Sequence, residues 1–74
     1  PNPANRETWI VFKNTLKTPH ELILRQHDGK VVYQAGIRSG VNSYKLSLDK
    51  ISSGMYFLEI KSGTETSVQK LIIR

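Results

Sequence analysis

The sequence contains no cysteine, so it offers no disulfide and no thiolate nucleophile. The lack of cysteine fits a reducing cytosol and equally fits a cysteine-poor exported protein. No apolar run approaches the roughly 20 residues that span a bilayer. No basic segment followed by an apolar one marks a signal peptide. We expect a single domain of modest stability, because a chain this short buries only about 60% of its unfolded surface.

Signatures of catalysis and metal binding are also missing. His20 and His27 flank one short apolar stretch, and neither lies near a Gly-x-Ser-x-Gly elbow. We interpret His27 and Asp28 as part of a turn rather than as a proton-transfer pair. The six acidic residues lack the spacing of a calcium loop, and no glycine-rich phosphate loop precedes a helix. The sequence therefore predicts no catalytic residue, no metal site and no cofactor.

Acidic residues are few compared with basic ones: six Asp and Glu against eleven Lys and Arg, for a formal net charge of +5. Such a charge favours solubility and acidic partners. The basic residues are dispersed and do not alternate with aromatic ones, so we interpret them as solvated faces and guarded sheet edges. Nucleic-acid binding is the weakest of the functions considered, and a steep salt dependence of binding would reveal it.

What the chain does contain is short alternating stretches separated by turn residues. The stretches cover residues 8–13, 21–25, 31–34, 42–48, 55–61 and 67–73. No window keeps apolar residues at helical spacing over the length of a helix. Several short strands with regular turns predict an all-β sandwich or a small barrel.

Glycine-containing turns predict which strands form hairpins. Residues 27–30 join the second and third stretches, and residues 62–64 join the fifth and sixth. Alternation also predicts the core, whose members are Ile10, Phe12, Leu22, Leu24, Val32, Tyr44, Leu46, Leu48, Ile51, Tyr56, Leu58, Ile60, Leu71 and Ile73. We expect Trp9, the only tryptophan, to pack in or over this core rather than to form an exposed sugar-stacking platform.

Four segments carry a resemblance to a known family: residues 1–5, 28–32, 48–56 and 70–74. In this order and spacing they resemble the C-terminal sorting domain of type IX secretion, a module of surface and secreted proteins in certain Gram-negative bacteria. The resemblance covers essentially the whole chain, with residues 1–5 as the end of a linker and residues 6–74 as the sorting domain. Two departures stand out: Arg6 and Glu7 where many members carry a glycine, and Gln26 where many carry an acidic residue.

The resemblance implies an immunoglobulin-like antiparallel β-sandwich of about six to seven short strands and no enzymatic activity. It implies export through the periplasm to the cell surface or extracellular space. The implied partners are the type IX outer-membrane translocon with its shuttle components and a gingipain-like cysteine-protease sortase. That sortase commonly removes the domain and joins the upstream cargo to an anionic lipopolysaccharide.

The resemblance also implies roles for particular residues. The opening motif contains Pro1, Asn2 and Pro3, and a Gly-x-Tyr motif contains Gly54 and Tyr56. The terminal motif is the one most tied to export, and it consists of Lys70, Leu71, Ile72, Ile73 and Arg74. An outermost strand ending in this motif offers backbone groups to a partner sheet, with Lys70 and Arg74 as electrostatic guides. An exposed edge can also pair two copies of the domain.

Two other interpretations stay open. In the first, Leu71 and Ile73 only close the sandwich, while Lys70 and Arg74 only face water. In the second, the chain is an immunoglobulin- or fibronectin-like adhesion or carbohydrate-binding module, with Trp9 or the tyrosines as its contact surface.

Overall fold

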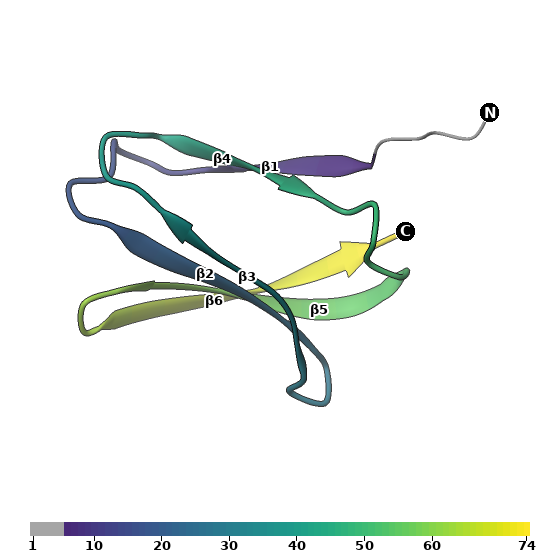
Figure 1. Ribbon diagram of the computed structural model, residues 1–74. Helices are drawn as coiled ribbons and strands as arrows, with labels where there is room; N and C mark the ends of the chain where they lie inside the picture. The colour runs from purple at the N-terminus through teal and green to yellow at the C-terminus, as the bar shows by residue number, and fades with distance from the viewer. Residues whose placement is uncertain (1–5) are drawn as a thin grey trace.

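The computed structural model describes residues 6–74, which form six strands in two antiparallel layers (Figure 1). The strands are β1 (Glu7–Val11), β2 (His20–Gln26), β3 (Val31–Ile37), β4 (Ser43–Ser47), β5 (Gly54–Ser62) and β6 (Glu65–Ile73). One layer pairs β1 with β4, and the other has the order β3-β2-β5-β6. Within residues 6–74 there is no helix that is long and apolar enough to cross a membrane. The predicted all-β sandwich is confirmed.

The pairing pattern is that of an immunoglobulin-like sandwich. In that fold, strands C′, C, F and G form one sheet, and strands A, B, E and D form the other. The order β3-β2-β5-β6 corresponds to C′-C-F-G, and β1-β4 corresponds to B-E. Tyr56, near the start of β5, donates its hydroxyl to the carbonyl oxygen of Ser52 at 2.8 Å, as the tyrosine corner does near the start of strand F. No strand among residues 6–74 occupies the A or D position.

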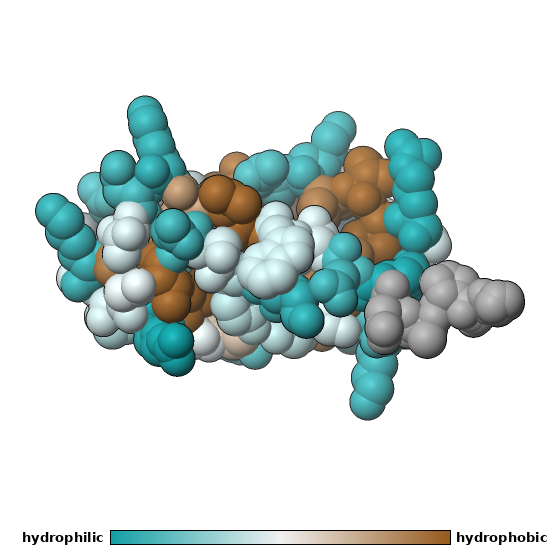
Figure 2. Space-filling model, turned by 90° about the horizontal axis from the view of Figure 1, so that it is seen from above, coloured by the Kyte–Doolittle hydropathy of each residue, from teal (hydrophilic) through white to brown (hydrophobic). Residues whose placement is uncertain are grey.

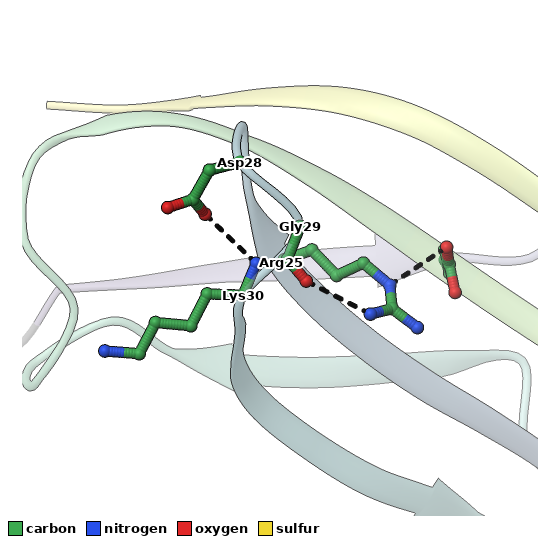
Figure 3. Close-up of polar contacts among 5 residues, drawn as sticks. Arg25, Asp28, Gly29 and Lys30 are labelled. Atoms are coloured by element: carbon green, nitrogen blue, oxygen red, sulfur yellow. Dashed lines mark hydrogen bonds and ion pairs between the residues drawn. The ribbon is translucent and has the colours of Figure 1, made fainter.

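Both predicted hairpins are present, and the β2–β3 turn is tied to the neighbouring strand (Figure 3). Gly29 takes a φ of +96°, and the Asp28 carboxylate accepts a hydrogen bond from the Lys30 backbone amide at 3.0 Å. Arg25 donates to the carbonyl oxygen of Gly29 at 3.2 Å and to the Glu59 carboxylate at 3.1 Å. This one side chain therefore links the turn, β2 and β5.

The core lies between the two layers. All fourteen predicted core residues are either buried or packed against the buried cluster. Alternation missed Leu16 and Ile37 of that cluster, because Leu16 lies in a loop and the predicted third stretch ended before Ile37. The Leu16 backbone is hydrogen-bonded to Val41 at 2.9 Å and to Gly40 at 2.8 Å, which extends the β1–β4 pairing into the loop. Ile23 is also buried, although alternation places it on the other face of β2.

A tyrosine pair joins the layers at the β3–β4 side. The hydroxyl groups of Tyr33 and Tyr44 lie 2.7 Å apart and share a hydrogen bond. This hydrogen bond, together with desolvation, raises the pKa of Tyr44 to about 12. The neutral phenol is therefore the form that the folded state favours.

The burial of Leu24 predicts how a smaller side chain would affect stability. Because Leu24 is fully buried, Leu24→Ala removes contacts and leaves a cavity, which should lower the free energy of unfolding by about 2–5 kcal/mol. Val31→Ala, at an exposed position of β3, serves as the control and should change it by less than about 0.5 kcal/mol. Urea unfolding measures both values. Similar losses in the two variants would contradict the assignment of the core.

The raised pKa of Tyr44 predicts that its contribution to stability depends on pH. Tyr44 in the unfolded chain loses its proton near 10.0, whereas the folded chain holds it to about 12. The unfolded state thus binds fewer protons in this window, so the stabilisation is fully present below the lower pKa and is lost as pH rises toward the higher one. The stability advantage of the wild type over Tyr44→Phe should be larger at about pH 8 than at about pH 11. Urea unfolding of both proteins at each pH measures it, and an unchanged difference would refute the contribution.

Candidate recognition site

The terminal motif lies in β6 and is divided between two faces by strand alternation. Ile73 is 3% exposed and Leu71 packs against the core, whereas Ile72 is 48% exposed and Lys70 is also exposed. Successive side chains of a strand point to opposite faces, so the motif cannot act as one contiguous surface. Leu71 and Ile73 serve the core, and Lys70 and Ile72 face solvent.

The Gly-x-Tyr motif lies directly opposite the terminal motif. In the β5–β6 register Gly54 pairs with Ile73, and Tyr56 pairs with Leu71. Two motifs that are separate in the sequence therefore form one cross-strand unit. Gly54 has a φ of +155°, and a Cβ there would lie 3.6 Å from the Tyr56 ring. Glycine thus provides the backbone conformation with which β5 begins beside that ring.

Arg6 holds the end of β6 in place. Its guanidinium donates to the carbonyl oxygens of Leu48 and Ile51 and, at 2.9 Å, to the backbone oxygen of Arg74. Its backbone amide donates to the Asp49 carboxylate at 2.8 Å. In the sequence Arg6 stands out only as a departure from the family pattern, because nothing local marks an arginine whose partners lie more than forty residues away.

The outer face of the four-stranded layer carries exposed apolar side chains beside the terminal motif. Met55, Val68 and Ile72 are exposed, and Phe57 between them is partly buried. In register Met55 lies opposite Ile72, and Phe57 lies opposite Lys70. We call these four apolar residues the outer patch. Apolar surface next to an exposed lysine is typical of a protein-binding surface rather than of a catalytic centre.

On the opposite side of the molecule, the prediction for Trp9 is wrong. Trp9 is 57% exposed and lies opposite Lys45 on the outer face of the β1–β4 layer. Ile10 and Phe12 occupy the inward positions of this segment, so alternation turns Trp9 and Val11 outward. Figure 2, which views this side, shows apolar surface broken into separate areas by hydrophilic side chains.

Two grooves border the two-stranded layer, one on each side. The groove beside β1 has a volume of about 570 Å³ and extends to β5 and β6. The groove beside β4 has a volume of about 430 Å³ and is lined by Trp9, Ile37, Tyr44 and Lys45 among others. Because A and D flank B and E in the immunoglobulin fold, these grooves lie where the two further strands would run.

The two histidines lie apart, at opposite ends of β2. His20 begins β2, where its Nδ1 lies 2.8 Å from the carbonyl oxygen of Thr18, and His27 lies in the exposed turn after β2. The Asp28 carboxylate bonds the backbone of Lys30, which supports the interpretation of this segment as a turn. Across residues 6–74, no three metal-ligating side chains gather.

Comparison with known protein families identifies the family of the chain. A family model described as a secretion system C-terminal sorting domain matches residues 1–74. The chain belongs to this family. The sorting domain is a C-terminal signal for type IX secretion, which directs a protein to the cell surface or the extracellular space. No curated protein matches the chain. The opening motif, Pro1, Asn2 and Pro3, lies outside the described residues.

Arg6 makes a prediction about the end of β6. Arg6→Lys replaces a planar group that bonds three backbone oxygens with a point charge that cannot reach all of them. We expect the free energy of unfolding to fall by about 1–3 kcal/mol, the range for unsatisfied part-buried polar groups. Amide exchange at Leu71 and Ile73, whose backbone groups point toward β5, should accelerate. The control is Arg38→Lys, at an exposed position, and an equal loss there would contradict the special role of Arg6.

Proposed function

We propose that the type IX outer-membrane translocon, with its shuttle components, recognises this sorting domain through its terminal motif after export to the periplasm. The observation that carries the proposal is the alternation in β6, which leaves Lys70 and Ile72 exposed on the last strand. Lys70 supplies a positive charge for acidic groups of the translocon, and Ile72 supplies apolar contact area.

The remaining residues of the two motifs position this surface. Gly54 and Tyr56 fix the start of β5, against which Leu71 and Ile73 are paired. Arg74 contributes its backbone oxygen to the contact with Arg6 and leaves its own side chain exposed as a second positive charge. The terminal motif therefore combines residues that are recognised with residues that hold them in place.

The proposal extends to processing at the cell surface by a gingipain-like sortase, which removes the domain and joins the cargo to anionic lipopolysaccharide. Support comes from the arrangement of the chain ends. The start of β1 and the end of β6 lie at the same end of the sandwich, joined through Arg6 (Figure 1). Arg6, the first of the described residues, therefore lies beside the terminal motif.

An adhesion or carbohydrate-binding function is the second candidate. The observation in its favour is that Trp9 is exposed and lines the groove beside β4 together with Tyr44. An exposed aromatic ring beside a groove suits stacking on a sugar. Trp9→Ala separates the two functions, because it should abolish adhesion and leave export unchanged.

The proposal is tested by export of a periplasm-directed fluorescent protein fused to these residues. The double variant Lys70→Ser, Ile72→Ser should melt like the wild type, since both side chains are exposed, and should lose surface display. Surface fluorescence is compared in a competent strain and in one without the translocon. Trp9→Ala is the exposed-site control and should be displayed normally.

A second variant separates recognition from folding. Leu71→Ala with Ile73→Ala removes contacts with the core and should lower the melting temperature together with display. Wild-type display of the Lys70→Ser, Ile72→Ser variant would refute recognition through these side chains. Display of the wild type in the strain without the translocon would refute the function itself.

A further inference from the structure

The open side of the sandwich lies between β1 and β6. Each of these strands has one paired neighbour, β4 and β5 respectively, so each is an edge strand of its layer. The groove of about 570 Å³ lies between them, with Phe12 and Lys13 on one wall and Ser67 and Gln69 on the other. The A position of the immunoglobulin fold is on this side, and no strand among residues 6–74 fills it.

β6 is an unprotected edge. It extends over nine residues and pairs with β5 without a register shift. Proteins commonly guard such edges with proline, bulges or charges that point inward, because unpaired backbone groups attract other strands. β6 contains no proline and no glycine, and its charged residues are Lys70 on the outer face and Glu65, which lines the groove at the hairpin end. A long regular edge of this kind is a template for a further strand.

The register shows which backbone groups are available. Gly63 and Thr64 form a two-residue loop, with Ser62 opposite Glu65 and a φ of +59° at Gly63, as a type II′ hairpin requires. The residues that flank such a loop form a hydrogen-bonded pair, and bonded pairs alternate along the strands. The backbone groups that point away from β5 therefore belong to Thr66, Val68, Lys70 and Ile72.

The first two-thirds of β6 is accessible on three sides. Its inward side chains Ser67 and Gln69 line the groove and remain exposed, because the two-stranded layer does not extend over them. Its outward side chain Val68 is 58% exposed. A strand added to this edge would place alternate side chains in the groove and beside the outer patch.

The charges indicate what kind of strand fits. On the outer face of the four-stranded layer, Lys61 lies opposite Glu21, and Glu59 is paired with Arg25 at 3.1 Å, so these charges are balanced. Lys70 makes the part of the face beside apolar Val68 and Ile72 positive. A complementary strand carries acidic and apolar side chains on the side that meets this face.

We infer that the free edge of β6 accepts an extended, acidic and apolar segment of a partner polypeptide, which becomes a fifth strand of the β3-β2-β5-β6 sheet. This inference rests on the proposed function, because the partner belongs to the secretion machinery. Affinity comes from backbone hydrogen bonds to Thr66, Val68, Lys70 and Ile72, and selectivity comes from the groove and the outer patch.

The test uses proline, which removes an outward amide donor without breaking the bonds to β5. Val68→Pro in the reporter fusion should reduce surface display about tenfold or more in the competent strain, because edge pairing is interrupted. Val11→Pro is the matched control. The Phe12 amide donates to the Asn42 carbonyl, just before β4, and Arg6 accepts from the Leu48 amide, just after it. Bonded pairs alternate between these two, so the backbone of Val11 faces the free edge of β1. This variant should be displayed at the wild-type level.

Val68→Ala keeps the amide and shortens one side chain of the outer patch, so it should retain most of the display that Val68→Pro loses. A loss of display in Val68→Ala as large as that in Val68→Pro would assign recognition to the side chain and overturn strand addition. Loss in Val11→Pro, or normal display of Val68→Pro, would overturn the choice of β6. Thr66→Pro repeats the test at the hairpin end of β6 should Val68→Pro fail to fold, as judged by its melting temperature.

Two further measurements show whether a different segment occupies the free edge of β6. Light scattering that shows a wild-type dimer and a Val68→Pro monomer would assign the edge to a second copy. A melting temperature lowered by Val68→Pro in the fusion, but not in the isolated residues, would assign it to the upstream chain. Either result would overturn the inference. A wild-type fusion that never reaches the surface would instead refute the proposed function, so the two failures are distinguishable.

Discussion

The architecture depends on one constraint: a two-stranded layer must cover a four-stranded one. The β1–β4 layer covers β2 and the start of β5, and Leu22 and Leu24 of β2 are fully buried beneath it. The β1–β4 layer does not reach the first two-thirds of β6, whose inward residues Ser67 and Gln69 are polar and exposed. This difference in width between the two layers produces the grooves, the unpaired edge of β6 and the exposure of β6. Because the inward residues of β6 are polar, their exposure to water costs little.

Within this open sandwich, Arg6 closes one end. A guanidinium has donors in a fixed fork, so a single side chain can bond backbone oxygens from the β4–β5 loop and from Arg74. The tyrosine corner at Tyr56 holds the neighbouring loop. The exposed members of the terminal motif thus lie on a supported strand, although no element of residues 6–74 covers the first two-thirds of that strand. Support at one end and exposure along the edge agree with the proposed recognition of the folded domain.

Alternation explains where the prediction of the core succeeded and why the prediction for Trp9 failed. It predicted Leu71 and Ile73 as core residues, and these are packed, so the same period also separates them from Lys70 and Ile72. Trp9 was predicted to be packed on the assumption that a small core needs every large ring. Period-two alternation places Trp9 on the outer face instead, and the ring is exposed. Leu16 lies in a loop and not in an alternating stretch, so no sequence pattern predicted its burial, which depends on backbone bonds to residues 40 and 41.

By itself, the sequence determined the strands, their hairpins and nearly all of the core, because these depend on period-two alternation and on glycine turns that act over short distances. Its ordered motifs also determined the family, which the match over residues 1–74 confirms. Tertiary structure alone decided that the Gly-x-Tyr and terminal motifs pair across β5 and β6, that Arg6 bonds Arg74, and that no strand of residues 6–74 pairs with the outer edge of β6. These features join residues far apart in the chain, and no local pattern encodes which backbone oxygens a distant arginine will meet or which strands lack a neighbour.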